Sequence, residues 1–538
     1  MSDGCTTLEY RRLRAPRENG SRLIEPPLSE VSALLSANEE RRRQASTEIC
    51  CRPLADLAQQ ARGELLAAAR AHTARYRDLP PPAETDRLLL AGHQPQLFHP
   101  GVWYKNFVLS HLAQRERAVA INLQVDSDTI KRTGLRVPGG SSTEPTIEEV
   151  HFDAPGPEIP FEERTILDRG QFGSFAKRVQ SRIAPFVANP LVGEFWKLAV
   201  ARANETENLG AAIAEARHQL EGQWGLNTLE LPLSKVCALP SFRWFTLHNL
   251  VELPRLREYY NASVHEYRRV NHVRSANHPV PDLIEEQDWL EAPYWIWKAD
   301  QPRRRRLFVR RRRDVLELRS RDELLAEVPI AADCEDYRGV EALAGLADRG
   351  IKLRTRALMT TLFARLLLGD LFLHGIGGAK YDEVTDLLFR RFYGVEPPGY
   401  LVVSATLELP IAHQNVREED VLRIRGQLRE LVFHPEKYLR TDAEGSPATA
   451  ERVAAKQAWI EREPTRETAR TRCRAIRAIN EELQASVASR REELEQELSA
   501  ISAQLRSRAI LGGREFSFCL YPAQMLQDFL LAIPRASP

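Results

Sequence analysis

The alternation of apolar and polar stretches predicts a layered α/β core beginning near residue 88. Leu88–Ala91 is apolar throughout and is followed by Gly92, as expected of a strand buried on both faces. Val102–Leu112 has the apolar spacing of a helix, and Ala118–Val125 is a second apolar run. Together these segments predict one βαβ unit, whose connection should be right-handed.

A second apolar strand, glycine loop and helix follow late in the chain. Leu371–His374 is apolar up to its last residue and runs into a loop that begins at Gly375. Thr228–Val236 and Leu401–Thr406 are further strand candidates. The pattern therefore predicts an α/β fold with a Rossmann-like parallel-sheet core and helical insertions.

Charged helical sequence dominates the region from about Thr449 to Arg506. Apolar residues recur there three, four or seven positions apart: Ile476, Ile479, Leu483, Val487, Leu494, Leu498, Ile501 and Leu505. This spacing predicts a C-terminal α-helical coiled coil, either an antiparallel hairpin or the contact of a homodimer. Gly512-Gly513 ends it, and Phe516–Pro522 is predicted as a closing strand.

These patterns predict four segments. They are an N-terminal helical segment (1–82), a Rossmann-like core (83–412) with insertions at about 139–225 and 241–330, a coiled-coil domain (413–510), and a C-terminal segment that returns to the core (511–538).

Charge and cysteine content narrow the classes of function. The chain has 75 basic and 74 acidic residues, a net charge of +1, so we expect no nucleic-acid partner. The eight arginines of 303–306 and 310–313 predict an exposed hairpin with a charged face; the alternative is a phosphate or carboxylate site that uses one or two of them.

Seven cysteines without a Cys-x-x-Cys pair indicate neither a disulfide framework nor a zinc ribbon, which favours a reducing cytoplasm. Cys237 and Cys519 follow apolar residues and are predicted to be buried. The charged start of the chain and the lack of a long apolar run predict a cytoplasmic protein without a membrane partner.

Candidate chemistry gathers directly after the first predicted strand. His93, Gln94, His99 and Lys105 offer hydrogen-bond donors for a carboxylate or phosphate. Either histidine could act as a general acid or base near neutral pH, or serve only as a structural hydrogen-bonding group.

Two acidic residues, Asp126 and Asp128, follow the second predicted strand, with Lys131 shortly after. A carboxylate pair at a strand end suits binding of an amine, of sugar hydroxyls or of hydrated Mg²⁺. The alternative is a helix cap and a surface acid. Direct metal ligation by this pair with His93 and His99 is chemically possible, although no zinc spacing is present.

Five short segments follow one another in a recognisable order: Ala91–Gln94 with Leu97-Phe98, Asp126–Asp128, Leu353–Thr355, Gly375–Gly378 and Leu520–Pro522. In these segments the chain resembles the bacillithiol biosynthesis cysteine-adding enzymes, a family of cysteine ligases. The sequence departs from the family pattern at His93, at the turn His99–Gly101 and at Ala379-Lys380.

The resemblance implies a Rossmann-like core, a dimerising coiled coil and an enzyme that joins cysteine to the amino group of an amino-sugar conjugate. A small amino-sugar or thiol substrate and ATP or another adenine nucleotide with Mg²⁺ are the expected ligands. The catalytic candidates are His93, His99, Asp126 and Asp128. The substrate-binding candidates are Gly92, Gln94, Lys105, Asn106, Lys131, Arg354, Gly375, Gly377, Gly378, Lys380 and Tyr381.

Two alternatives remain at the level of the sequence. One is a Rossmann-type nucleotidyltransferase or sugar-modifying enzyme with a different substrate. The other is a non-catalytic assembly protein whose coiled coil is the functional part. A Ser-His-Asp hydrolase is disfavoured because the chain lacks Gly-x-Ser-x-Gly.

Overall fold

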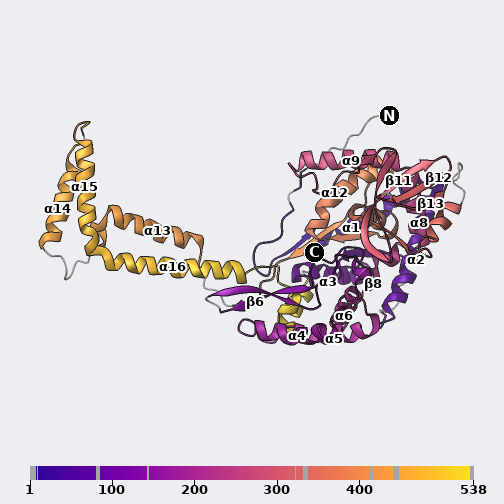
Figure 1. Ribbon diagram of the computed structural model, residues 1–538, viewed down its shortest axis with the longest axis horizontal. Helices are drawn as coiled ribbons and strands as arrows, with labels where there is room; N and C mark the ends of the chain where they lie inside the picture. Colours follow the sequence, from indigo (N-terminus) through magenta and orange to yellow (C-terminus); the bar gives the residue numbers. More distant parts are fainter. Residues whose placement is uncertain are drawn as a thin grey trace. The chain divides into compact units, whose positions relative to one another are not determined.

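The computed structural model describes residues 8, 10–11, 13–79, 85–141, 144–321, 323–330, 337–411, 416–439, 447–463 and 465–533. The chain divides into two compact units. The first comprises Met1–Val137, Glu149–Leu409 and Arg514–Pro538, and the second Pro138–Glu148 and Pro410–Gly513. Figure 1 labels their helices and strands.

A six-stranded sheet forms the centre of the first unit. Its spatial order is β1 (Arg22–Glu25), β16 (Leu401–Ala405), β15 (Leu371–His374), β4 (Leu88–His93), β5 (Val119–Gln124) and β8 (Leu229–Pro232). All neighbours pair in parallel except β1, which is antiparallel to β16. The winding reverses between β4 and β15, because β5 and β8 follow β4 on one side while β16 follows β15 on the other. The prediction of an α/β fold with a parallel sheet is confirmed.

Helix α3 (Pro100–Arg115) connects β4 to β5 and is buried on nearly all sides. His99 caps it by accepting the Gly101 N–H at Nδ1, and Pro100 occupies the first turn, where a missing N–H costs nothing. A Cβ at Gly101 would lie 2.0 Å from the Ala405 carbonyl oxygen, so only glycine permits this approach of α3 to β16. The same helix thereby packs across the strand-order reversal.

The other helical segments of the first unit surround this sheet or lie between the two sheets. They are η1 (Leu28–Glu30), α1 (Val31–Gln44), α2 (Leu54–Thr73), η2 (Phe161–Glu163), α4 (Arg169–Ile183), α5 (Val192–Thr206), α6 (Leu209–Gln223), α7 (Leu233–Val236), α8 (Pro240–Val251), α9 (Leu253–Val270), α10 (Arg338–Ala344), α11 (Ala357–Phe363), the π-helix η3 (Ala364–Leu368), α12 (Ile376–Arg391), η6 (Phe518–Leu520) and α17 (Ala523–Leu531). Two short hairpins complete the small elements: β2 (Glu48–Ile49) with β3 (Arg52–Pro53), and β6 (Gly134–Gly140) with β7 (Pro145–His151). Residues 138–148 of the second hairpin are assigned to the second unit.

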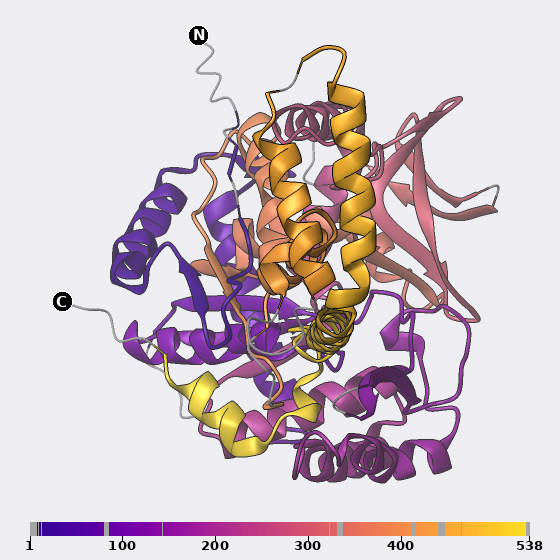
Figure 2. The same cartoon turned by 90° about the vertical axis from the view of Figure 1, so that its left-hand side faces the viewer.

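A second, antiparallel sheet belongs to the same unit (Figure 2). Its order is β13 (Glu323–Pro329), β12 (Val315–Ser320), β11 (Gln301–Arg312), β10 (Trp289–Lys298) and β14 (Ile351–Thr355), with β9 (Glu285–Glu286) beside β10. Seven of the eight clustered arginines lie on β11, where Leu307–Val309 is buried. The predicted exposed hairpin is therefore part of a six-stranded sheet, in which β11 pairs with β10 and β12.

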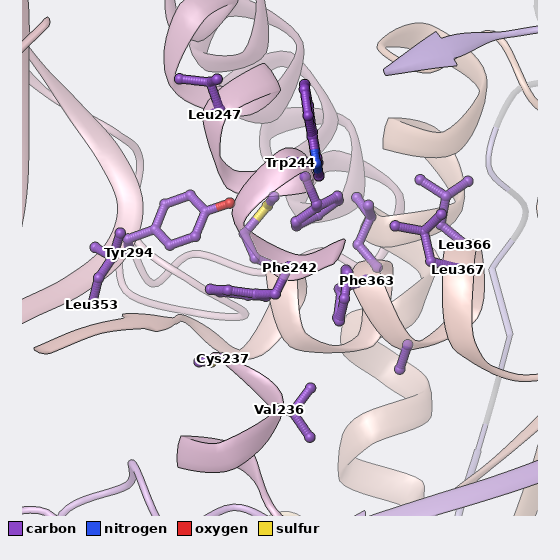
Figure 3. Close-up of a cluster of buried hydrophobic side chains, with 14 of the residues drawn as sticks. Val236, Cys237, Phe242, Trp244, Leu247, Tyr294, Leu353, Phe363, Leu366 and Leu367 are labelled. Atoms are coloured by element: carbon purple, nitrogen blue, oxygen red, sulfur yellow. The ribbon is translucent and has the colours of Figure 1, made fainter. Parts of the chain in front are cut away.

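One large hydrophobic core joins helices to both sheets (Figure 3). Phe242 of α8 contacts Phe363 of α11 with ring centroids 5.3 Å apart, and Tyr294 of β10 and Leu353 of β14 approach from the second sheet. Helix α8 is apolar on most of its surface and thus fills the space between elements on opposite sides. This packing fixes the position of β14 relative to α7 and α8.

The predicted closing strand at Phe516–Pro522 is wrong. Phe518–Leu520 forms the 3₁₀ helix η6, and only Pro522 makes an isolated bridge, to Pro190. The Phe518 ring lies 4.4 Å from the Trp103 ring, and its backbone N–H donates to the Phe98 carbonyl. Aromatic burial rather than strand pairing therefore returns this segment to the core.

The second unit consists mainly of helices α13 (Glu418–Phe433), η4 (Pro435–Tyr438), α14 (Pro447–Glu461), α15 (Ala469–Leu483), η5 (Gln484–Val487) and α16 (Ala488–Leu511). Figure 1 shows α13 along α16 and α14 beside α15. Arg508 near the end of α16 donates to the Val416 carbonyl just before α13, so these two helices are antiparallel within one chain.

The predicted apolar seam is interrupted at η5, where the last turn of α15 passes into α16 through a 3₁₀ segment. Leu494 of α16 and Val487 of η5 are buried with Ile424 and Leu431 of α13. The seam is therefore covered at least partly by the chain itself. None of the helices in the described part of the chain combines the length and apolarity needed to cross a membrane.

Candidate functional site

The carboxyl ends of β5 and β8 meet at Asp126. The Asp126 carboxylate accepts hydrogen bonds from the backbone N–H of Ser234, at 2.9 Å, and from the Ser234 hydroxyl. Ser234 follows β8 directly, in the short helix α7. Two neighbouring parallel strands end at the same edge, which is where ligands bind in open α/β sheets.

The short helix η2 supplies a second carboxylate to this edge. The Glu162 N–H donates to the Asp126 carbonyl at 2.9 Å, which fixes the backbone of η2 against the end of β5. The Glu162 carboxylate then accepts from Nε and Nη2 of Arg354, both at 2.9 Å. This fork geometry is the strongest form of an arginine–carboxylate pair. Lys352 pairs with Glu163 at 2.6 Å.

Asp128 is bound from two sides. It accepts from Gln94 Nε2 at 3.0 Å, so β4 and β5 are joined through the two residues that the sequence predicted to share a site. Arg304 of β11 pairs with the other oxygen at 2.9 Å and lies over the Trp295 ring, 4.9 Å from its centroid. One of the clustered arginines thus serves the strand-end carboxylates.

We call Asp126, Asp128, Glu162, Arg304 and Arg354 the strand-end cluster. Burial raises the pKa of Asp126 to about 7; the Glu162 carboxylate adds to the rise and the Ser234 hydrogen bonds oppose it. Burial alone would lower the pKa of Arg354, yet its pairing with Glu162 raises that pKa. Asp126 can therefore exchange a proton near neutral pH while Arg354 stays charged.

Apart from Gln94, the candidates of the first predicted loop make contacts outside the strand-end cluster. Lys105 Nζ donates to the Gly92 carbonyl at 2.5 Å, and burial lowers the Lys105 pKa to about 8. Burial, with Lys105 nearby, lowers the His93 pKa to about 3. His93 is therefore a neutral imidazole at pH 7, able to accept a proton only weakly. This finding disfavours the expected acid–base role for His93.

His99 and Asn106 lie outside the strand-end cluster. His99 caps α3, faces Glu515 at 3.7 Å, and has a pKa lowered by burial. Asn106 Nδ2 donates to Glu221 at 2.8 Å, in a different buried network. Lys131 is exposed on the segment that follows Asp128.

The second predicted loop begins helix α12. Gly375 is its N-cap, and open space surrounds the Cβ positions of Gly375 and Gly377. Gly378 leaves room for the His374 imidazole, since a Cβ there would lie 2.8 Å from Nδ1. Tyr381 contacts His278 edge to face, with ring centroids 5.9 Å apart.

Arg354 is thus the one late-chain candidate that reaches the strand-end cluster. Within the described ranges, no hydrogen bond or ion pair connects residues 375–381, Lys380 included, to Asp126 or Asp128.

The sequence did not predict a buried pair, His374 and Asp382, at the end of β15. His374 Nε2 lies 2.7 Å from Asp382 Oδ2, and Arg365 Nη1 lies 2.6 Å from the same oxygen. Arg365, with His374 beside it, lowers the Asp382 pKa, although burial alone would raise it. A signal for His374 was present in the sequence, because it is the polar residue that ends an apolar run. The same signal made Asp126 a candidate.

A second buried carboxylate network joins α6 and β8 to α3. Arg217 Nη1 donates to Glu221 at 2.6 Å and Nη2 donates to Glu230 at 2.5 Å. Glu221 also accepts from Trp103 at 2.6 Å, and Gln124 donates to Glu230 at 2.5 Å. We call Arg217, Glu221 and Glu230 the Arg217 cluster.

The Arg217 cluster does not fit a metal ion. His218, Glu221 and Glu230 are close enough to share one. However, the Arg217 guanidinium already bonds both carboxylates, and both His218 nitrogens are engaged, by Tyr76 at 2.8 Å and by Thr228 at 3.0 Å. A cation is therefore already supplied by the chain.

A cavity of about 240 Å³ adjoins the strand-end cluster through Ser234, Lys352 and Arg354. Cys237 also lines it, and burial raises the Cys237 pKa to about 12. The thiol stays protonated, so Cys237 is a poor nucleophile, and its predicted burial and that of Cys519 are confirmed. The sequence analysis did not single out Glu162 or Ser234, because only the fold brings them to Asp126, and it included Arg304 only as one of eight clustered arginines.

Comparison with known protein families and with curated proteins finds no match to this chain.

Proposed function

We propose that the chain is a carbon–nitrogen ligase that joins the carboxyl group of cysteine to the amine of an amino-sugar conjugate. The observation that carries this proposal is the buried Asp126 carboxyl, with a pKa of about 7, beside an Arg354–Glu162 pair and a cavity. The cysteine and amino-sugar identities come from the sequence resemblance alone.

Amide formation needs a neutral amine, because an ammonium has no lone pair with which to attack. Ionised Asp126 is suited to accept the proton that the amine loses as its nitrogen bonds the acyl carbon. The leaving group departs with the electron pair of the broken carbon–oxygen bond. Arg304 and Arg354 would stabilise negative charge on the acyl oxygen, while Asp128 would orient the amine.

A free carboxylate must be activated before this step, and ATP would supply an acyl phosphate or acyl adenylate. We propose that the sheet is Rossmann-like, because its strand order reverses between β4 and β15. The open space at Gly375 and Gly377, at the N-terminus of α12, fits a phosphate group.

We also propose a homodimer formed through the predicted coiled-coil region. Leu422 and Phe433 of α13 are 66% and 53% exposed, and their spacing of about three turns places them on one helix face. Light scattering coupled to size exclusion tests this: wild type should elute as a dimer and the double variant Leu422→Ser/Phe433→Ser as a monomer. A monomeric wild type would refute the dimer.

Mass spectrometry tests the reaction. The purified chain is incubated with cysteine, ATP and a glucosamine–malate conjugate, and the expected product is the conjugate plus cysteine minus water. Transfer of a nucleotide to the sugar would instead favour the nucleotidyltransferase alternative. Absence of amide with each of several amino sugars would refute the ligase proposal.

A further inference from the structure

The cavity beside the strand-end cluster has a polar end and an apolar body, and its occupant can be inferred from both. α7 and α8 form one wall, the end of α10 forms another, and the edge strand β14 closes the third. Its volume of about 240 Å³ suits a ligand on the order of ten non-hydrogen atoms.

Apolar side chains dominate the body of the cavity. Phe242 and Leu353 face each other across it from α8 and β14, with Cys237 below them in Figure 3. Leu343 and Leu346 contribute from the α10 side. Such a lining favours a hydrocarbon portion of the ligand, because burial of apolar surface is the main source of affinity for a small organic molecule.

The charge at the mouth of the cavity is not balanced by the protein. Arg243 of α8 lines the cavity and donates to the Ala238 carbonyl at 3.0 Å. Among the described residues no carboxylate pairs with it, whereas Lys352 and Arg354 on the same cavity are bound by Glu163 and Glu162. Arg243 is therefore the cation left for an anionic ligand group.

A polar group is also buried in the wall. Thr246 lines the cavity and is 1% exposed, and its hydroxyl, near that of Tyr294, has no hydrogen bond of standard geometry among the described residues. A buried hydroxyl without a good partner is costly, and a ligand oxygen reaching this wall would supply one.

We propose that this cavity binds a small apolar carboxylic acid, with its carboxylate on Arg243 and its hydrocarbon portion between Phe242 and Leu353. Carboxylate is favoured over phosphate because a single unpaired arginine faces a mainly apolar space, which could not stabilise a doubly charged group. Binding alone is proposed, so the inference goes beyond the ligase proposal and does not depend on it.

Isothermal titration calorimetry of the full chain with hexanoate tests this inference. We expect saturable binding of one hexanoate per chain, with a Kd on the order of 1 mM. Hexan-1-ol, which lacks the charge, and acetate, which lacks the apolar portion, should each bind at least about tenfold more weakly.

Two variants locate the site. Arg243→Gln should weaken hexanoate binding about tenfold by removing the charge-assisted hydrogen bond, and Ala344→Phe, which fills the cavity from α10, should weaken it at least as much. Arg136→Gln, at an exposed position on β6, is the matched control and should leave the Kd unchanged. A cooperative thermal unfolding transition, measured for each variant and for the wild type, is the control that each variant is folded.

No saturable hexanoate binding to the wild type, or an unchanged Kd in either Arg243→Gln or Ala344→Phe, would overturn the inference. Absence of ligase activity in a wild type that binds hexanoate as expected would count against the proposed function alone, since calorimetry does not require turnover.

Discussion

The strand-end cluster and the Arg217 cluster are chemically alike but differ in access. Each holds a buried carboxyl group whose pKa is raised to about 7 by burial, Asp126 in one and Glu230 in the other. Each also has a buried arginine bonded to a carboxylate. A shifted pKa therefore does not by itself separate a reactive carboxyl from a structural one.

The surroundings of the two carboxyl groups distinguish the two clusters. Asp126 is bonded to Ser234, which lines a cavity, whereas Glu230 is 0% exposed and bonded on both oxygens by Arg217 and Gln124. A ligand can approach the first cluster, while the second would have to open. We therefore expect substitutions to affect catalysis at one cluster and stability at the other.

The largest effect is expected for Asp126→Asn. Loss of the proton acceptor should reduce kcat/KM for amide formation by about 10²- to 10⁴-fold. The free energy of unfolding at pH 8 should change by no more than about 1 kcal/mol, because the neutral amide avoids burial of an ionised group. Coupled product assays and urea unfolding measure the two quantities.

Asp314→Asn, in the exposed turn before β12, is the control and should alter neither quantity. Unchanged turnover in Asp126→Asn would remove Asp126 from the mechanism and end the distinction between the clusters.

Arg217→Met is the counterpart for stability. It leaves two buried carboxylates without their cation, and removal of one partner from a buried pair costs about 3–5 kcal/mol. Urea unfolding should show this loss, or the variant should fail to fold. The matched substitution Arg136→Met at an exposed site should cost less than about 0.5 kcal/mol. A stability loss below about 1 kcal/mol would show that the Arg217 cluster is not a structural element.

The sequence predicted the sheet edge at which the strand-end cluster lies, but not which side chains pair there. Strands at β4 and β5 were expected because short apolar runs end at polar residues, and Gln94 and Asp128 do meet there. Arg354 was selected through the family resemblance, yet its partner Glu162 lies 192 positions away and carried no local signal. Such pairings depend on how β14 is placed by the shared core, which periodicity cannot reveal.

One short apolar run was misleading. Phe516–Pro522 resembles a strand in composition, but its aromatic side chains fill space around Trp103 in a 3₁₀ turn. The long seam of the second unit did predict helices, although the same spacing serves both intrachain and intermolecular pairing.

A smaller effect concerns pH. Because Asp126 must be ionised to accept a proton, kcat/KM should fall about tenfold per pH unit below a pKa of about 7 and level off above it. The ratio of wild-type to Asp126→Asn rates should follow this curve, since ionisation of the substrate amine affects both proteins equally. A ratio independent of pH between 5.5 and 8.5, values about 1.5 units either side of that pKa, would contradict the assigned proton acceptor.

Asp126 and Glu230 should also lower stability together as pH rises. Each folded-state pKa is above its unfolded value, so the folded protein holds these protons more tightly. Their contribution to stability is full below the unfolded pKa near 4 and is lost as pH rises to about 7. Unfolding free energies measured across this window should decline in wild type and decline less in Asp126→Asn.

The smallest catalytic effect is expected for Glu230→Gln, which makes the same chemical change in the sealed cluster. Glutamine retains an oxygen for Arg217, and Glu221 still neutralises that guanidinium, so kcat/KM of the folded protein should remain within about threefold of wild type. Its unfolding free energy should decline less with pH than that of wild type, because the titrating group is gone. A loss of turnover as large as that of Asp126→Asn, in a variant that unfolds normally, would mean that the Arg217 cluster contacts the reacting groups. Access to ligand would then not distinguish the two clusters.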